Sequence, residues 1–209
     1  MKIFVLFLLA FSMVACGGSV AVNNTANASI TTPTPSATAA ADADTANSNQ
    51  AFRADETPAG EADFEGTAGV TEKENPAVTG VAILREVRSA THPGYDRVVF
   101  EFDRDELPTY HLEYIDKPVR ACGSGDAVPL SGDGWLEVRF TDAQAHTPEG
   151  QPTIKDRARS PDLPVVKDLK ITCDFESEVT WVAGVSSPNH YRVLELKGPT
   201  RLVVDIKHK

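Results

Sequence analysis

The side chains in this sequence best suited to catalysis or metal binding are its histidines and cysteines. The histidines lie far apart in the chain, and no pair of them has the H-E-x-x-H spacing of a zinc-binding helix. No cluster of cysteine and histidine has the spacing of a zinc site either. The spacing therefore predicts no metal site, and it gives no support to zinc-dependent hydrolysis. The five histidines are His92, His111, His146, His190 and His208.

Nucleophile and acid motifs are equally weak. Ser124 stands between two glycines, but its surroundings do not form the G-x-S-x-G turn that exposes a nucleophilic serine. Asp103, Asp105 and Glu106 make a small acidic cluster without the spacing of a calcium-binding loop. We interpret this cluster as hydrated turn charges. The sequence also carries no P-loop or dinucleotide-binding glycine pattern. We therefore expect a protein that is not an enzyme and that uses no cofactor.

Three adjacent polar residues are candidates for contacting a ligand. Tyr95, Asp96 and Arg97 follow the turn residues Pro93 and Gly94 and lead into a β-branched and aromatic run. Asp96 and Arg97 either form a structural ion pair at the entry of a strand or contribute to a glycan-binding edge. Both interpretations remain open from the sequence alone.

The two tryptophans differ in their predicted surroundings. Trp181 alternates with apolar residues in VTWVAGV, and this period of two places it on the buried face of a sheet. Trp135 belongs to the polar-facing set of WLEVRF and stands beside a glycine-rich turn. It is either a core residue or an exposed platform for a ligand.

Short apolar runs separated by glycine and proline turns position these residues. About eight strands in roughly 130 residues are typical of an all-β protein, and we expect an antiparallel β-sandwich. No stretch has convincing helical periodicity, and the polar segment 142–163 is the least strand-like part. The predicted strands are 80–90, 97–103, 109–115, 135–140, 165–175, 179–185, 191–196 and 202–207.

Charge excludes two kinds of partner. The chain has 209 residues and a formal net charge of -10, and its acidic excess is greatest between residues 17 and 77. No segment beyond the N-terminus has a surplus of lysine and arginine. Binding to nucleic acid through its phosphates is therefore not expected, and neither is docking of a polybasic patch on anionic lipid.

The N-terminus has the features of an export signal. Lys2 precedes an apolar run over 3–11 that is too short to span a bilayer as a helix. The following residues, SMVACGGS, resemble the lipobox of bacterial lipoproteins, in which the cysteine is acylated; the matching position here is Cys16. The resemblance implies that residues 1–16 are a lipoprotein signal and that Cys16 is anchored in a lipid bilayer. The alternative is an ordinary secretory signal with a free thiol at Cys16.

Residues 17–77 have the composition of a linker. Alanine, threonine, serine, asparagine, glycine and acidic residues dominate, and Phe52 and Phe64 are the only aromatic residues. Such a segment buries too little apolar surface to offset its ordering entropy, so we expect a disordered tether before a β-domain at 78–209. As a flexible coil it would span about 40–45 Å.

Several motifs follow one another in the predicted β-domain: HPGYDRVVFEF at 92–102, GSG at 123–125, AHTPEG at 145–150, DF at 174–175 with VTWVAG at 179–184, and RLVVD at 201–205. Together they resemble one family, the AMIN-like domain of bacterial lipoproteins, over about Leu84–His208. The resemblance implies a non-catalytic, exported β-domain that faces the periplasm or cell wall and associates with peptidoglycan or an envelope protein. It identifies no ligand-binding residue.

Two cysteines depart from the pattern of that family. With Cys16 assigned to lipid, Cys122 and Cys173 form an even pair in an exported, oxidising setting. A bridge between them would close a long loop and add on the order of 4 kcal/mol in the loop-entropy model. The alternative is two unpaired thiols, with Cys173 buried on its strand and Cys122 in a turn.

The sequence therefore predicts a membrane-tethered envelope lipoprotein whose β-domain binds peptidoglycan. The alternative is a lipoprotein that docks an envelope protein through an open edge of a sheet.

Overall fold

The computed structural model describes residues 64–76 and 79–209 of the chain. The predicted signal sequence, the lipidation site at Cys16 and most of the predicted linker lie outside these residues. No helix in the described part of the chain is long and apolar enough to cross a membrane.

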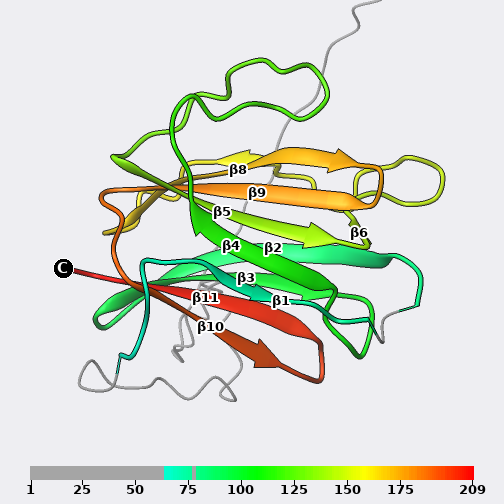
Figure 1. Cartoon of the computed structure of the whole chain (residues 1–209), viewed down its shortest axis with the longest axis horizontal. Coiled ribbons are helices and arrows are strands. Elements are labelled where there is room, and N and C mark those ends of the chain that lie inside the picture. Colours follow the sequence, from blue (N-terminus) through cyan, green and yellow to red (C-terminus); the bar gives the residue numbers. More distant parts are fainter. Residues whose placement is uncertain (1–63, 77–78) are drawn as a thin grey trace, which may run out of the picture. The chain divides into compact units, whose positions relative to one another are not determined.

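The described residues form two β-sheets that pack face to face (Figure 1). This arrangement confirms the predicted all-β sandwich. The five-stranded sheet has the order β10-β11-β3-β2-β6, and the six-stranded sheet has the order β1-β4-β5-β9-β8-β7. The strands are β1 (Thr71–Lys73), β2 (Ala82–His92), β3 (Tyr95–Phe102), β4 (Thr109–Tyr114), β5 (Gly134–Thr141), β6 (Ala143–Gln144), β7 (Ala158–Arg159), β8 (Val166–Phe175), β9 (Glu178–Val185), β10 (Tyr191–Leu196) and β11 (Arg201–Lys207).

Strict alternation along the strands builds the core between the sheets. In β5 the side chains of Leu136, Val138 and Phe140 are buried, whereas the residues between them are partly exposed. Phe100 of β3 contacts Phe140 of the opposite sheet edge to face, with ring centroids 5.2 Å apart. Trp181 is fully buried beside Phe100, in agreement with its predicted place in the core.

Long-range pairing joins the middle of the chain to its end. Strand β3 lies between β2 and β11 in the five-stranded sheet, and Val99 is paired with Val203. Asp205 is paired with Arg97 in the same register. Because every second residue faces the core, Val98 and Phe100 point inward and Arg97 and Val99 point to the outer face.

The sandwich begins earlier in the chain than the predicted linker boundary. Thr71–Lys73 forms strand β1 along the edge of β4, and Thr67 exchanges backbone hydrogen bonds with Tyr191 of β10. The Tyr191 hydroxyl also donates to the carbonyl oxygen of Gly69. Residues 64–73 therefore form the edge of the six-stranded sheet next to β4 and contact the edge strand β10 of the other sheet. A three-residue strand in a polar segment is too short to show the hydrophobic alternation from which a strand is predicted.

The weakest region of the prediction, 142–163, contains two short strands. Strand β6 is paired in parallel with β2, and β7 is paired with β8. Asp174 on β8 links this region to the six-stranded sheet. Its carboxylate accepts hydrogen bonds from Ala145 N, His146 Nδ1 and Arg157 Nη2.

Candidate functional site

A long loop covers part of the outer face of the six-stranded sheet. Residues 115–133 connect β4 to β5, and the loop forms a small apolar cluster with the sheet beneath it. Val119 and Leu130 of the loop and Val182 of β9 are buried in this cluster. Gly184 of β9 permits the close approach, because a Cβ atom there would lie 2.2 Å from the carbonyl oxygen of Ser131. The loop is therefore packed on the sheet.

A covalent bond and three polar contacts fasten the loop to β8. Cys122 and Cys173 form a disulfide, which resolves the alternatives that the sequence left open. Beside it, Cys122 N donates to the carbonyl oxygen of Thr172 at 2.9 Å. Lys170 Nζ donates to the carbonyl oxygen of Pro129, and Ser131 N donates to Asp168 Oδ2 at 2.7 Å. The loop is thus held at its tip and at its end.

The surroundings of Asp168 favour the charged form of its carboxyl group. Burial raises the pKa of its carboxyl group, but the hydrogen bonds from Ser160 and from Ser131 N, together with Lys170, outweigh that effect and lower the pKa below its usual value. The negative charge strengthens the hydrogen bond that anchors the end of the loop.

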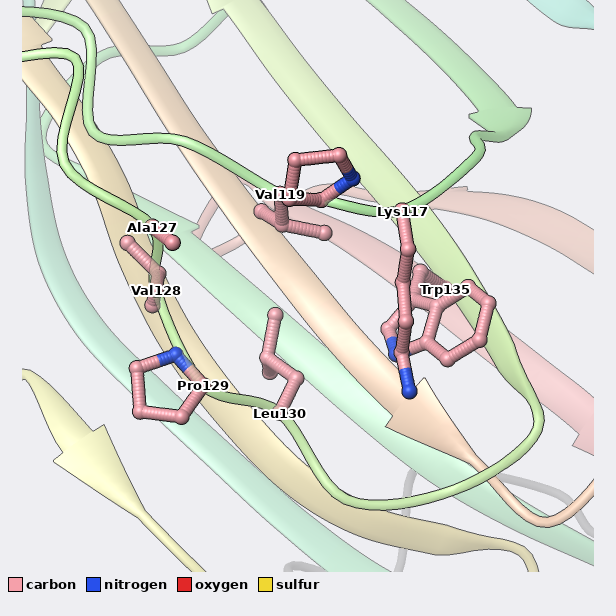
Figure 2. A pocket seen from close by; sticks show the side chains of 8 residues that line it. Lys117, Val119, Ala127, Val128, Pro129, Leu130 and Trp135 are labelled. Atoms are coloured by element: carbon pink, nitrogen blue, oxygen red, sulfur yellow. The ribbon is translucent and has the colours of Figure 1, made fainter.

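The loop and Trp135 enclose an open pocket of about 510 Å³. Figure 2 shows the aliphatic side chains of the loop along one side of it and the Trp135 indole with the Lys117 side chain along the other. Lys117 Nζ lies 4.0 Å from the centroid of the Trp135 ring, in a cation–π contact. The lining residues are Lys117, Pro118, Val119, Ala127, Val128, Pro129, Leu130 and Trp135.

The lining of this pocket combines features that small-ligand sites share. Its walls are apolar and aromatic, Lys117 places one cation at the indole, and Trp135 Nε1 is a buried donor without a hydrogen-bond partner in the described part of the chain. An apolar surface with a few polar groups that fix orientation is typical of small-ligand sites. Trp135 is partly buried against the loop cluster and also lines the pocket, so its role as a ligand platform stays a prediction.

The other predicted ligand residues lie on the opposite sheet. Arg97 is 2% exposed and Asp205 is fully buried; Arg97 Nε and Nη2 donate to the two carboxylate oxygens of Asp205 at 2.6 and 3.0 Å. Arg192 Nε donates to the same carboxylate at 2.9 Å. The Tyr95 ring is buried against both guanidinium groups, 5.4 Å from that of Arg97 and 5.2 Å from that of Arg192.

Asp96 has a structural role. Its side chain is fully buried, and its Oδ2 accepts hydrogen bonds from the backbone of Val165 and Val166. His208 Nε2 lies 2.9 Å from Asp96 Oδ1. These contacts join β3 to the start of β8 and to the C-terminal residues. The structure therefore separates Trp135 from the group formed by Tyr95, Asp96 and Arg97, and does not bring the four residues into one site.

Sequence analysis missed the loop residues of the pocket. The signal for them was present as apolar residues next to proline, in K-P-V at 117–119 and A-V-P-L at 127–130. Apolar residues in a segment without strand alternation indicate packing on another element. Among residues 64–76 and 79–209, no group of three or more potential metal ligands comes together.

The fold is that of a two-sheet β-sandwich domain. The model of the AMIN-like domain family matches residues 82–208, more than half of the chain, and the protein belongs to that family. No curated protein and no solved structure matches the sequence. Membership of the family suggests a non-catalytic domain of an exported envelope protein, associated with peptidoglycan or with an envelope partner.

Proposed function

We propose that this protein is a lipoprotein anchored to a bacterial membrane through acylated Cys16, and that its β-sandwich binds peptidoglycan. The family match over residues 82–208 carries the peptidoglycan part of the proposal, and the lipobox-like sequence around Cys16 supports the lipid anchor. Residues upstream of the sandwich act as a tether, which lets the domain reach the cell wall from the membrane surface. The protein holds its domain at the wall and catalyses no reaction there.

The Trp135 pocket is the surface on which peptidoglycan would bind. Peptidoglycan combines sugar rings, which stack on indole faces, with short peptides of small residues that carry carboxylates. Trp135 and the aliphatic loop residues supply the apolar contact, and Lys117 supplies one cation for a carboxylate. The disulfide between Cys122 and Cys173 holds the loop in place before a ligand arrives, which reduces the entropy lost on binding.

Co-sedimentation of the full chain with purified peptidoglycan tests the proposal. We expect the protein to pellet with the sacculi at low salt and Trp135→Ala to reduce the bound fraction at least fivefold. Phe175→Ala is the matched control, because Phe175 is an aromatic residue at a hairpin far along β8 and is 61% exposed. An unbound wild-type chain would overturn the proposal. Equal losses for the two variants would reject the pocket as the binding surface.

A second function is supported by one feature of the five-stranded sheet. Strand β10 is at the edge of this sheet, and among the described residues the backbone hydrogen bonds of Thr67 cover only its first residue, Tyr191. An extended segment of an envelope protein would pair with the rest of β10. Cross-linking from residue 194, followed by identification of the captured peptide, distinguishes this function from binding to peptidoglycan.

A further inference from the structure

The lining of the Trp135 pocket narrows the kind of ligand that it can hold. Apart from Trp135 and Lys117, the lining consists of valine, leucine, alanine and proline side chains. No lining residue has a hydroxyl, amide or carboxylate side chain. A sugar ring carries hydroxyl groups around its edge, and those turned toward these walls would lose water without gaining a hydrogen-bond partner. The lining therefore favours a ligand that is mostly aliphatic.

The indole of Trp135 is not an open surface for stacking. Lys117 Nζ lies 4.0 Å from the ring centroid, and Figure 2 shows the Lys117 side chain alongside the indole. The same ring packs against the apolar cluster of Val119, Leu130 and Val182. A sugar that stacks on the face next to Lys117 has to displace the ammonium group and break its cation–π contact. The position of Lys117 therefore disfavours sugar stacking in the pocket.

The charge of Lys117 is available to an incoming anion. Within residues 64–76 and 79–209, the indole is the partner of its ammonium group, and no carboxylate forms an ion pair with it. Lys170, beneath the same loop, differs: its Nζ donates to the carbonyl oxygen of Pro129 and lies 3.4 Å from Asp168 Oδ2. A charge-assisted hydrogen bond to a carboxylate is stronger than a contact between neutral groups. Lys117 thus provides the pocket with one site for an anionic group.

The walls of the pocket are fixed to each other within the loop. Val128 N donates to the carbonyl oxygen of Val119 at 2.8 Å, and Ala121 N donates to that of Asp126 at 2.9 Å. These bonds fold the loop back on itself, and the disulfide at Cys122 fastens it to β8. The aliphatic walls are therefore in place before a ligand arrives, so little conformational entropy is lost when they are contacted.

We propose that the Trp135 pocket binds the free carboxylate end of a short aliphatic peptide, with the carboxylate on Lys117 and the methyl groups against Val128 and Leu130. This inference rests on the proposed function, because the peptides of peptidoglycan supply such ends. The glycan chains make no stacking contact in the pocket. Cross-linking between these peptides converts a carboxylate into an amide and removes its charge, so the domain favours parts of the wall where peptide ends are free.

Two matched probes test the site in the full chain: N-acetyl-D-alanyl-D-alanine as the free acid and as the carboxamide. Tryptophan fluorescence reports binding, because Trp135 lines the pocket whereas Trp181 is buried in the core. We expect the acid to bind at least fivefold more tightly than the amide. Lys117→Gln should abolish this difference, and Lys155→Gln, at an exposed lysine outside the pocket, should retain it.

Three results with these probes would overturn the inference. The first is equal affinity of the wild type for the acid and the amide. The second is tighter binding of the disaccharide of N-acetylglucosamine than of the acid. The third is the absence of any response to the acid at millimolar concentration.

Sacculi from which an amidase has removed the peptides separate this inference from the proposed function. We expect the wild-type chain to pellet with intact sacculi and at least fivefold less with the stripped glycan. Equal binding to both would overturn the inference and leave the proposed function standing, because the glycan would then be the ligand. Binding to the acid probe without binding to intact sacculi would overturn the proposed function alone.

Discussion

Arg97 and Asp205 form a bidentate ion pair between directly paired positions of β3 and β11, with both side chains removed from water. The two residues are 108 positions apart in the sequence, and Arg192 of β10 donates to the same carboxylate. The pair therefore links three neighbouring strands through one buried charge. Each side chain offsets the cost of burying the other's charge, because either ion would be costly to bury alone.

Asp205→Asn should strongly destabilise the sandwich. The substitution keeps the size of the side chain but leaves the guanidinium groups of Arg97 and Arg192 without their shared carboxylate. We expect the free energy of unfolding to fall by about 3–5 kcal/mol, the usual cost of breaking a buried pair. Urea denaturation followed by circular dichroism measures it. Asp133→Asn, at an exposed turn residue, is the control and should change stability by less than about 0.5 kcal/mol.

The disulfide should contribute stability through the loop that it closes. Cys122 and Cys173 are separated by 51 positions, so the loop-entropy model gives on the order of 4 kcal/mol. We expect a reductant to lower the urea midpoint of the wild type. The variant Cys122→Ala with Cys173→Ala should start at the lower midpoint and should not respond to the reductant. A wild-type midpoint that is the same with and without reductant would contradict this expectation.

The sequence was sufficient for the sandwich because its long strands are defined by local alternation. WLEVRF and RLVVDIK carry their inward and outward faces in the order of their residues, and these strands form where the pattern places them. The disulfide could be predicted for a similar reason. Once Cys16 is assigned to lipid, only one pair of cysteines remains in an exported chain. Neither prediction required knowing which distant segments of the chain come together.

The residues of the pocket were harder to predict from the sequence, because the pocket depends on which distant segments come together. Trp135 carried a signal, but nothing local placed Lys117 over its ring or the loop on Val182. From the sequence, Arg97 was a partner either for its neighbour Asp96 or for a ligand, and only the strand register shows that it pairs with Asp205. Strand β1 was assigned to the linker because its partner, β4, lies far along the chain and supplies the hydrogen bonds.

Stability should decrease in acid through Asp174. Burial raises the pKa of this carboxyl group, but hydrogen bonds from Ala145 N, Arg157 and His146 outweigh burial and lower the pKa below its usual value. A lowered pKa in the folded state stabilises the protein above the unfolded-state pKa of about 4, and that stability is lost as the pH falls through the folded-state pKa. We expect the urea midpoint to decline below about pH 4.

Asp174→Asn separates this carboxylate from the other acids. At pH 7 the variant should lose about 2 kcal/mol, because its hydrogen bonds to Arg157 and His146 no longer involve a charged acceptor. Its stability should then decline less steeply than that of the wild type below pH 4. Parallel pH profiles for the two proteins would contradict the assignment.

Removing residues before Val78 should expose a strand edge. Strand β1 pairs with β4, and Thr67 pairs with Tyr191, so a chain that begins at residue 78 lacks both covers. An uncovered edge favours pairing between molecules, and we expect that chain to elute as a dimer or larger species in size-exclusion chromatography. A chain that begins at residue 64 should elute as a monomer under the same conditions. Identical elution of the two as monomers would contradict the role of β1.

Lys117 should contribute to peptidoglycan binding through charge, separately from the apolar contact made by Trp135. Its ammonium group lies 4.0 Å from the indole centroid, and a bound carboxylate beside that ring would share the same cation. Lys117→Gln should lower the bound fraction about fivefold at 20 mM salt, and the difference from wild type should shrink at 500 mM salt because the contact is screened. Trp135→Ala should weaken binding at both salt concentrations. Lys155→Gln, an exposed lysine outside the pocket, is the control, and equal losses for the two lysine variants would show that the charge of Lys117 has no specific place in binding.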